Sequence, residues 1–141
     1  MAAAMPRSVA NVEYAGHTDT GRRRLANEDA FHCDQRMGLF AVCDGIGSQP
    51  SGEAASQIIA PALGHLIRRG LRDRDAPDAE RLRRGLGEIA AELSLNLYQQ
   101  SQAVSVLVGM GATLVAGLIK GRTSFLLHAG DSRGYCLRGG T

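Results

Sequence analysis

Acidic side chains stand at the boundaries of apolar, strand-like segments at three places in the sequence. Asp29 lies just before one such segment, Asp44 ends a second and Asp131 follows a third. Because the strands of one sheet can bring their ends together, we expect these carboxylates to lie close to one another. Clustered carboxylates repel one another unless a cation neutralises them, and a ligand set made of oxygen atoms favours a hard ion such as Mg²⁺ or Mn²⁺. The pattern therefore predicts a site for a divalent cation.

Two further residues extend this hypothesis from metal to phosphate. Gly45 has no side chain, so its backbone carbonyl can approach the ion that Asp44 binds. Arg24 lies shortly before Asp29, and its planar guanidinium suits the oxygen atoms of a phosphate. Two alternatives stay open. Asp-Gly is a common turn dipeptide, and the glycine-rich segment 45–53 could cradle a phosphate with backbone amides, although it lacks the ending of a P-loop.

The composition is that of one domain, or a piece of one, with ordinary charge. The chain has 141 residues, of which 44% are hydrophobic, and its formal net charge is +2. This near balance disfavours a protein built to bind nucleic acid. The N-terminal segment lacks the apolar core of a signal peptide, and no stretch approaches the length of a membrane span. We therefore expect a cytoplasmic protein with no membrane partner.

The cysteines and histidines give no metal-binding spacing. Cys33, Cys43 and Cys136 lie in strand-like segments without a CxxC pattern, so we expect small, buried side chains in a reducing compartment. The histidines are scattered as single residues, and we expect none of them to bind zinc: His17, His32, His65 and His128.

The elements that must position the acids begin with strands. We expect strands at 12–18, 30–34 and 38–43, the last two forming a hairpin through a polar turn. Apolar residues at helical spacing then predict a helix from Ala54 to about Gly70.

The remainder of the chain continues with a helix and returns to strands. Asp78 can cap a second helix that continues to about Leu97. Strands are expected at 111–119, 123–130 and 131–138. The order of strands, two helices and strands predicts an α+β domain in which the helices cover an antiparallel sheet.

Five short motifs follow one another along the chain: Arg24–Asp29, Phe40–Gly47, Gly52–Ser56, Gly109–Leu114 and Gly130–Arg133. Together they resemble the metal-dependent protein phosphatases of type 2C, particularly the compact bacterial ones. The resemblance spans nearly the whole chain. It implies the N-terminal half of a four-layer α/β/β/α sandwich, made of two antiparallel sheets with helices packed outside. Residues 1–141 would then form a partial domain whose C-terminal half is absent from this chain.

The resemblance also implies roles for individual residues. Arg24 would bind the substrate phosphate and Asp44 would bridge two metal ions, so both are expected to be catalytic. In the implied metal-binding set, Asp44 is the bridge and Gly45 provides a carbonyl ligand. Glu28 and Asp29 would hold metal-bound water, and Asp131 would be a ligand of a third, accessory ion. The implied reaction is hydrolysis of phosphoserine and phosphothreonine in proteins by water activated between two Mn²⁺ or Mg²⁺ ions, opposing a serine/threonine kinase.

The sequence departs from the family pattern in two ways. Ser48 and Ala112 stand where the family commonly has glycine and threonine; neither position is a ligand, so only packing should change. The sequence also stops at Thr141, about where the first half of the family's domain ends. Two aspartate ligands are then expected to be missing, and the chain alone to be inactive. The alternative is a non-catalytic, phosphatase-like binding module; a basic nucleic-acid-binding module is disfavoured by charge and by few aromatic residues.

Overall fold

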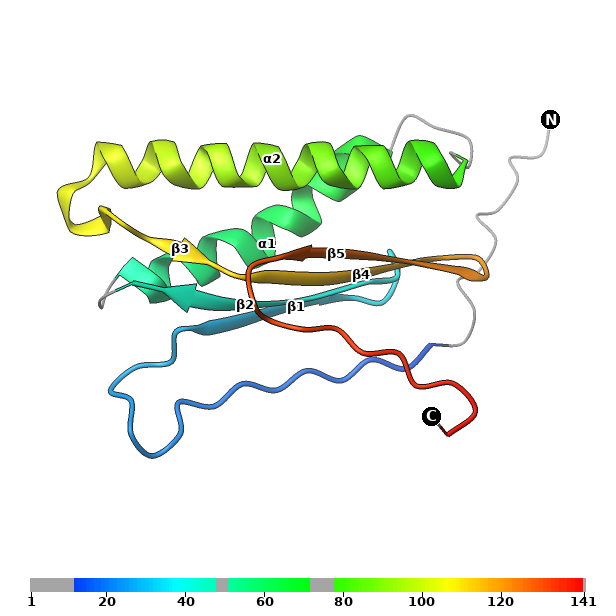
Figure 1. Cartoon of the computed structure of the whole chain (residues 1–141), viewed down its shortest axis with the longest axis horizontal. Helices are drawn as coiled ribbons and strands as arrows, with labels where there is room; N and C mark the ends of the chain where they lie inside the picture. The colour runs from blue at the N-terminus through cyan, green and yellow to red at the C-terminus, as the bar shows by residue number, and fades with distance from the viewer. Residues whose placement is uncertain (1–11, 48–50, 72–77, 141) are drawn as a thin grey trace.

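A computed structural model describes residues 12–47, 51–71 and 78–140. Its elements are β1 (Asp29–Asp34), β2 (Leu39–Ile46), α1 (Ser51–Leu71), α2 (Ala79–Ala103), the short 3₁₀ helix η1 (Ser105–Leu107), β3 (Gly111–Ala112), β4 (Leu114–Lys120) and β5 (Thr123–Ala129). The strands pair antiparallel in the order β1-β2-β4-β5, and β3 pairs with β2. Both helices lie on one face of this sheet (Figure 1). The predicted α+β class is confirmed.

The central strand β2 explains how the sheet separates a core from a second face. Leu39, Ala41 and Cys43 are buried and belong to the core cluster that includes α1, whereas Phe40 and Val42 alternate with them and are exposed. This alternation follows from the strand repeat, in which successive side chains point to opposite faces. We call the face opposite the helices the outer face. It carries a group of exposed apolar side chains: Phe31, Phe40, Val42 and Leu126.

The helix α1 lies between the sheet and α2 (Figure 1). Its buried row includes Ile59, Leu63 and Ile67, which pack against the buried residues of β2. The helix α2 packs mainly on α1 and reaches the sheet at β5. The prediction that the helices cover the sheet is therefore correct for α1 and only partly correct for α2. The predicted cap is confirmed, because the carboxylate of Asp78 accepts a hydrogen bond from the Arg81 amide at 2.7 Å.

Several predicted boundaries are wrong. The strand β2 does not stop at Cys43 but continues to Ile46, because the sheet pairs its last two residues with β3. The carboxylate of Asp44 therefore lies within a strand, not after one. The helix α1 starts at Ser51, before Ala54, while Ser48 lies outside the described residues.

The expected strands at 12–18 and 131–138 are also wrong. Both segments are extended but do not form strands. They run along the outer face without a hydrogen-bonded neighbour strand among the described residues (Figure 1). The first of them packs its side chains on that face, where the Tyr14 and Phe40 rings lie 6.0 Å apart.

The prediction of three buried cysteines holds for Cys43 alone. Cys33 and Cys136 are exposed. The side chain of Cys33 belongs to the exposed set of the alternating strand β1, on the outer face, and Cys136 lies in the extended C-terminal segment. Neither described helix combines the length and apolar composition that a membrane crossing requires.

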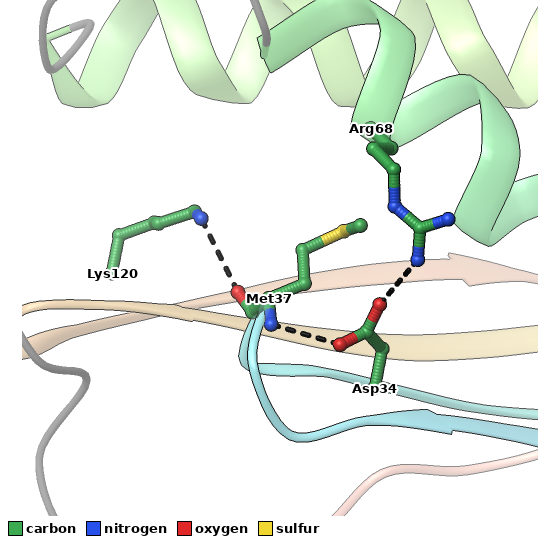
Figure 2. A network of polar contacts seen from close by, with 4 residues as sticks. All are labelled: Asp34, Met37, Arg68 and Lys120. Atoms are coloured by element: carbon green, nitrogen blue, oxygen red, sulfur yellow. Dashed lines mark hydrogen bonds and ion pairs between the residues drawn. The ribbon is translucent and has the colours of Figure 1, made fainter. Parts of the chain in front are cut away.

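A polar network holds the turn between β1 and β2 against α1 and β4. The Asp34 carboxylate accepts a hydrogen bond from the Met37 amide at 3.0 Å and pairs with the Arg68 guanidinium of α1 at 2.6 Å (Figure 2). The ammonium of Lys120, at the end of β4, donates to the Met37 carbonyl at 3.2 Å. One end of the β1–β2 hairpin is thereby tied to two other elements.

Candidate functional site

The opposite end of the β1–β2 hairpin carries two facing carboxylates. In the antiparallel register, Asp29 of β1 lies directly opposite Asp44 of β2. Opposite residues of an antiparallel pair point to the same face, and here that face is the outer one. Like charges at this spacing are destabilising in a sheet. The hairpin therefore presents an acidic pair whose mutual repulsion destabilises the sheet.

The electrostatic surroundings of Asp44 reflect this crowding. Burial raises the pKa of the Asp44 carboxyl above its ordinary value, and the neighbouring acid Asp29 and the charge of Asp131 raise this pKa further. The positive charge of Arg24 acts in the opposite direction. A cation placed between the carboxylates would relieve the same repulsion. Asp131 therefore acts on Asp44 through its charge, while its role as a metal ligand stays a prediction.

The backbone at Gly45 is where three segments meet. The Gly45 amide donates to the Glu28 carbonyl at 3.0 Å. A Cβ atom on Gly45 would lie 2.7 Å from the Glu28 carbonyl oxygen and would clash with the carbonyl oxygen of Gly52 at the start of α1. Only glycine fits this position, because any side chain would have to displace backbone atoms rather than flexible side chains.

Arg24 and Glu28 complete the acidic end of the hairpin. The guanidinium of Arg24 pairs with the Glu28 carboxylate at 2.9 Å; the Arg24 side chain is 71% exposed, whereas that of Glu28 is only 10% exposed. A cavity of about 210 Å³ lies beside them, and these residues line it: Asp19, Thr20, Arg24, Ala26, Asn27, Glu28, Asp29 and Asp44. A second cavity, of about 400 Å³, shares three of these acids (Asp19, Asp29 and Asp44) and extends to Ser132.

The structure thus gathers four of the predicted side chains around one cavity and leaves another outside it. Arg24, Glu28, Asp29 and Asp44 line the cavity, whereas Asp131 does not. This donor set, the carboxylates of Glu28, Asp29 and Asp44, is of the oxygen type that hard cations prefer, whereas Gly45 does not line the cavity. The donor set is partial, because the described part of the chain contains no group of three or more His, Cys, Asp or Glu side chains arranged to hold a metal ion.

Sequence reasoning missed a pair of hydroxyl groups that fixes Asp44. Thr113 is buried; its hydroxyl accepts from the Asp44 amide at 3.1 Å, and its own amide donates to the Asp44 carbonyl at 2.8 Å. The Thr113 hydroxyl also pairs with the hydroxyl of Ser132 at 2.5 Å. The ring of His128 bonds the Ser132 carbonyl at 2.7 Å and closes the turn that contains Asp131. This chain of contacts links the Asp131 turn to Asp44.

A second missed residue is Asp19, which lines both cavities. Its carboxylate accepts a hydrogen bond from the Gly21 amide at 2.7 Å. The only sequence signal for this turn is an acid two residues before a glycine, a pattern typical of many turns.

Comparisons with known proteins give consistent results. The family model described as "Protein phosphatase 2C" matches residues 17–141. The serine/threonine protein phosphatase PstP of Mycobacterium tuberculosis is 38% identical over 143 residues, covering 96% of this chain and 25% of PstP. The serine/threonine phosphatase stp of Listeria monocytogenes is 33% identical over 125 residues, covering 86% of this chain and 48% of stp.

Solved structures of PstP also match most of this chain. A crystal structure of PstP matches with a TM-score of 0.77 and 37% identity, covering 92% of this chain and 51% of that one. The catalytic domain of PstP in complex with two manganese ions matches with a TM-score of 0.72 and 34% identity, covering 92% and 52%, respectively. The chain therefore spans about half the length of these solved domains.

Proposed function

Because this chain belongs to the protein phosphatase 2C family, we propose that its site takes part in the metal-dependent hydrolysis of phosphoserine and phosphothreonine in proteins. The observation that carries the proposal is the cavity at the end of the β1–β2 hairpin, where Asp29 and Asp44 face each other and Arg24 lies beside them. Carboxylates suited to divalent cations and a guanidinium suited to phosphate meet there. The protein would oppose a serine/threonine kinase in the cytoplasm.

Each residue has a proposed part in the reaction. Asp44 would hold two Mn²⁺ or Mg²⁺ ions together with the Gly45 carbonyl, and Asp131 would serve an accessory third ion. The acids Glu28 and Asp29 would orient water, and Arg24 would bind two oxygens of the phosphoryl group and stabilise its charge. When bound, the ions would supply water of lowered pKa and neutralise the phosphoryl charge.

The ligand set that the described residues provide is incomplete for that chemistry, so we propose that residues 1–141 form the N-terminal portion of a type 2C domain and have negligible turnover by themselves. Two close carboxylates leave most of the coordination sphere of Mg²⁺ or Mn²⁺ to water, and such ions are weakly held. Further carboxylates would have to come from outside the described residues.

A chimera tests the proposed function. Residues 1–141 would replace the matching portion of the PstP catalytic domain, and hydrolysis of a phosphothreonine peptide would be measured with and without Mn²⁺. We expect manganese-dependent turnover that Asp44→Ala lowers by about a hundredfold or more, because no neighbour replaces a ligand shared by two ions. The matched control is Glu88→Ala, an exposed acid on α2, which should retain activity.

The partial ligand set favours one second candidate, a non-catalytic binding module for phosphopeptides. Under this alternative, the chimera would bind a phosphothreonine peptide but would not hydrolyse it at any Mn²⁺ concentration. Turnover that survives Asp44→Ala within a few-fold would contradict the proposed metal role of Asp44.

A further inference from the structure

The loop that leads to β1 carries two arginine side chains beside the candidate cavity. Arg22 and Arg23 are exposed and lie between Thr20 and Arg24, both of which line the cavity. Arg24 is paired with Glu28. Within the described residues, no hydrogen bond or ion pair engages the guanidinium of Arg22 or Arg23, so their donors are available to a ligand.

The backbone of this loop is fixed rather than loosely attached. At its base, the side-chain amide of Asn27 donates to the Thr18 hydroxyl at 2.9 Å, and the Asn27 side-chain oxygen Oδ1 accepts from the Asp29 backbone amide at 3.0 Å. At its turn, the Asp19 carboxylate holds the Gly21 amide, and Gly21 has a φ of +72°, which favours glycine. The loop lies near the end of the sheet where β1 begins and β2 ends, on the side away from the helices (Figure 1).

The lining of the cavity is mainly acidic and includes the cation Arg24, which Arg22 and Arg23 adjoin along the chain. Four acids line it: Asp19, Glu28, Asp29 and Asp44. With the phosphate and its metal ions occupying this lining, an acidic side chain beside the phosphorylated residue is attracted to cations outside it. Arg22 and Arg23 supply two such cations next to the residue that is proposed to bind the phosphate.

We infer that Arg22 and Arg23 select phosphoproteins in which the phosphorylated serine or threonine has acidic neighbours. This inference rests on the proposed function, since it takes the cavity as the phosphate site. Each guanidinium would bind a carboxylate of a flanking Asp or Glu in a forked hydrogen-bonded pair. The substrate class is therefore a phosphopeptide in an acidic context, and Arg22 and Arg23 are specificity-determining residues.

The test uses four fluorescent peptides that share one threonine-containing sequence. The threonine is either phosphorylated or not, and its neighbours are either glutamate or serine. Binding to the full chain is measured by anisotropy at low and at moderate salt, with Mn²⁺ present. For wild type, we expect the acidic phosphopeptide to bind about three- to tenfold more tightly than the neutral one, the range expected for two exposed ion pairs. Higher salt should reduce this ratio.

Matched variants assign the effect to the two arginines. Arg22→Ser combined with Arg23→Ser should bring the ratio between the acidic and neutral phosphopeptides close to one and leave the neutral phosphopeptide within about twofold of wild type. The double change to lysine should keep part of the ratio. The control, Arg81→Ser with Arg84→Ser, removes the same charge from exposed positions on α2 and should keep the ratio.

Two outcomes overturn the inference, and a separate comparison tests the proposed function. Equal binding of the acidic and neutral phosphopeptides by wild type overturns it. An equal loss for both phosphopeptides in the serine variant also overturns it, because Arg22 and Arg23 would then bind the phosphate itself. The proposed function depends instead on the phosphorylated peptides binding more tightly than the unphosphorylated ones, and on turnover by the chimera.

Discussion

Hydrogen bonds fix the backbone of Asp44, while neighbouring acids repel its carboxylate. Both of its backbone polar groups bond Thr113, while its side chain faces Asp29 across the hairpin. The raised pKa of Asp44 has a definite sign: its ionised form destabilises the metal-free fold at neutral pH, and this penalty disappears as the pH falls through the raised pKa. The site thus gives up stability to keep two acids together.

Replacing Asp29 should separate stability from metal binding. We expect Asp29→Asn to raise the free energy of unfolding of the metal-free chain by roughly 0.2–1 kcal/mol, because one like charge is removed at a largely exposed position. The same change should weaken Mn²⁺ binding, since a ligand oxygen with a full charge is lost. Urea unfolding in chelator and calorimetric titration with Mn²⁺ measure the two effects. If Asp29→Asn lowered both the free energy of unfolding and the affinity for Mn²⁺, the prediction would be wrong.

The hydroxyl of Thr113 should contribute more to the stability of the fold than the volume of its side chain does. Thr113→Val keeps the shape but leaves the Asp44 amide without its partner, so we expect a loss of about 1–3 kcal/mol in the free energy of unfolding. Thr113→Ser retains the hydroxyl and should recover part of that loss. Chemical denaturation compares the two variants. If serine destabilises as much as valine, packing rather than hydrogen bonding explains the role of Thr113.

The sequence predicted three of the four acidic residues that line the cavity, but it predicted neither Asp19 nor the hydroxyl groups behind Asp44. Asp29, Asp44 and Arg24 are recognisable because few residue types bind metal and phosphate, and the structure brings them together; their roles stay predictions. Thr113 and Ser132 were not recognisable, because a hydroxyl becomes part of a site only through neighbours far away along the chain. Asp44 and Thr113 are 69 positions apart.

At the scale of elements, the hairpin that presents the acids is anchored at its far end. The carboxylate of Asp34 binds the Met37 amide within the turn and Arg68 on α1 (Figure 2). A slip of one residue between β1 and β2 would move Asp29 to the other face of the sheet. The turn that contains Met37 therefore helps to keep Asp29 opposite Asp44.

This anchor predicts a defined pH dependence. The hydrogen bond from the Met37 amide, and then the contact with Arg68, hold the pKa of Asp34 below its ordinary value of 3.8, against the effect of burial. A lowered pKa contributes stability above the unfolded-state value and loses it as the pH falls through the folded value. We expect Asp34→Asn to cost roughly 1 kcal/mol at neutral pH and progressively less below pH 3.8. Urea unfolding at several pH values measures this; a cost independent of pH would contradict it.

The contact between α1 and the sheet can be tested at Ile59. This side chain is 5% exposed within the core cluster, and burial of a large aliphatic side chain contributes about 1.5–3 kcal/mol. Ile59→Asp removes that contribution and buries a charge, so we expect an unfolded or insoluble protein. His65→Asp, at an exposed position on the same helix, should stay folded. Circular dichroism and thermal melting distinguish the two; an unchanged melt for Ile59→Asp would contradict the packing.

The helices were predictable because a repeating apolar row is a local signal, and the outer segments were not. The alternation within β2 is interrupted in the sequence by Asp44 and Gly45, so the strand was predicted to end too early. The segments 12–18 and 131–138 have the composition of strands, but a strand needs a hydrogen-bonded neighbour, which composition does not reveal.

At the scale of the whole molecule, the sheet is covered on one face by α1 and α2 and only by extended segments on the other (Figure 1). Phe31, Phe40, Val42 and Leu126 remain between 38% and 61% exposed on that outer face. Contiguous apolar surface of this kind marks a place where another protein surface packs. The α+β class followed from the order of elements, whereas the second sheet was expected only from the family resemblance.

Residues 1–141 in isolation should therefore associate and should not turn over substrate. We expect sedimentation that depends on concentration, weak Mn²⁺ binding and no measurable hydrolysis of a phosphothreonine peptide. Val42→Thr combined with Leu126→Ser removes apolar surface from the outer face and should reduce association. Analytical ultracentrifugation measures this. A monomer that unfolds cooperatively, binds Mn²⁺ tightly and hydrolyses the peptide would show that the missing ligands lie within this chain.

The close approach of three backbone segments at Gly45 also bears on how such a protein can change over generations. Because no side chain fits between Gly45, Gly52 and Glu28, we expect a substitution of Gly45 to be lost through misfolding, whatever its effect on the chemistry. Arg22 and Arg23 are under no such constraint, since both side chains are exposed and, among the described residues, the path of their loop is fixed by Asp19, Gly21, the Arg24–Glu28 pair and the contacts at its base. Inherited variation can therefore accumulate at the rim while the centre stays constant, so that new targets become accessible without loss of the reaction.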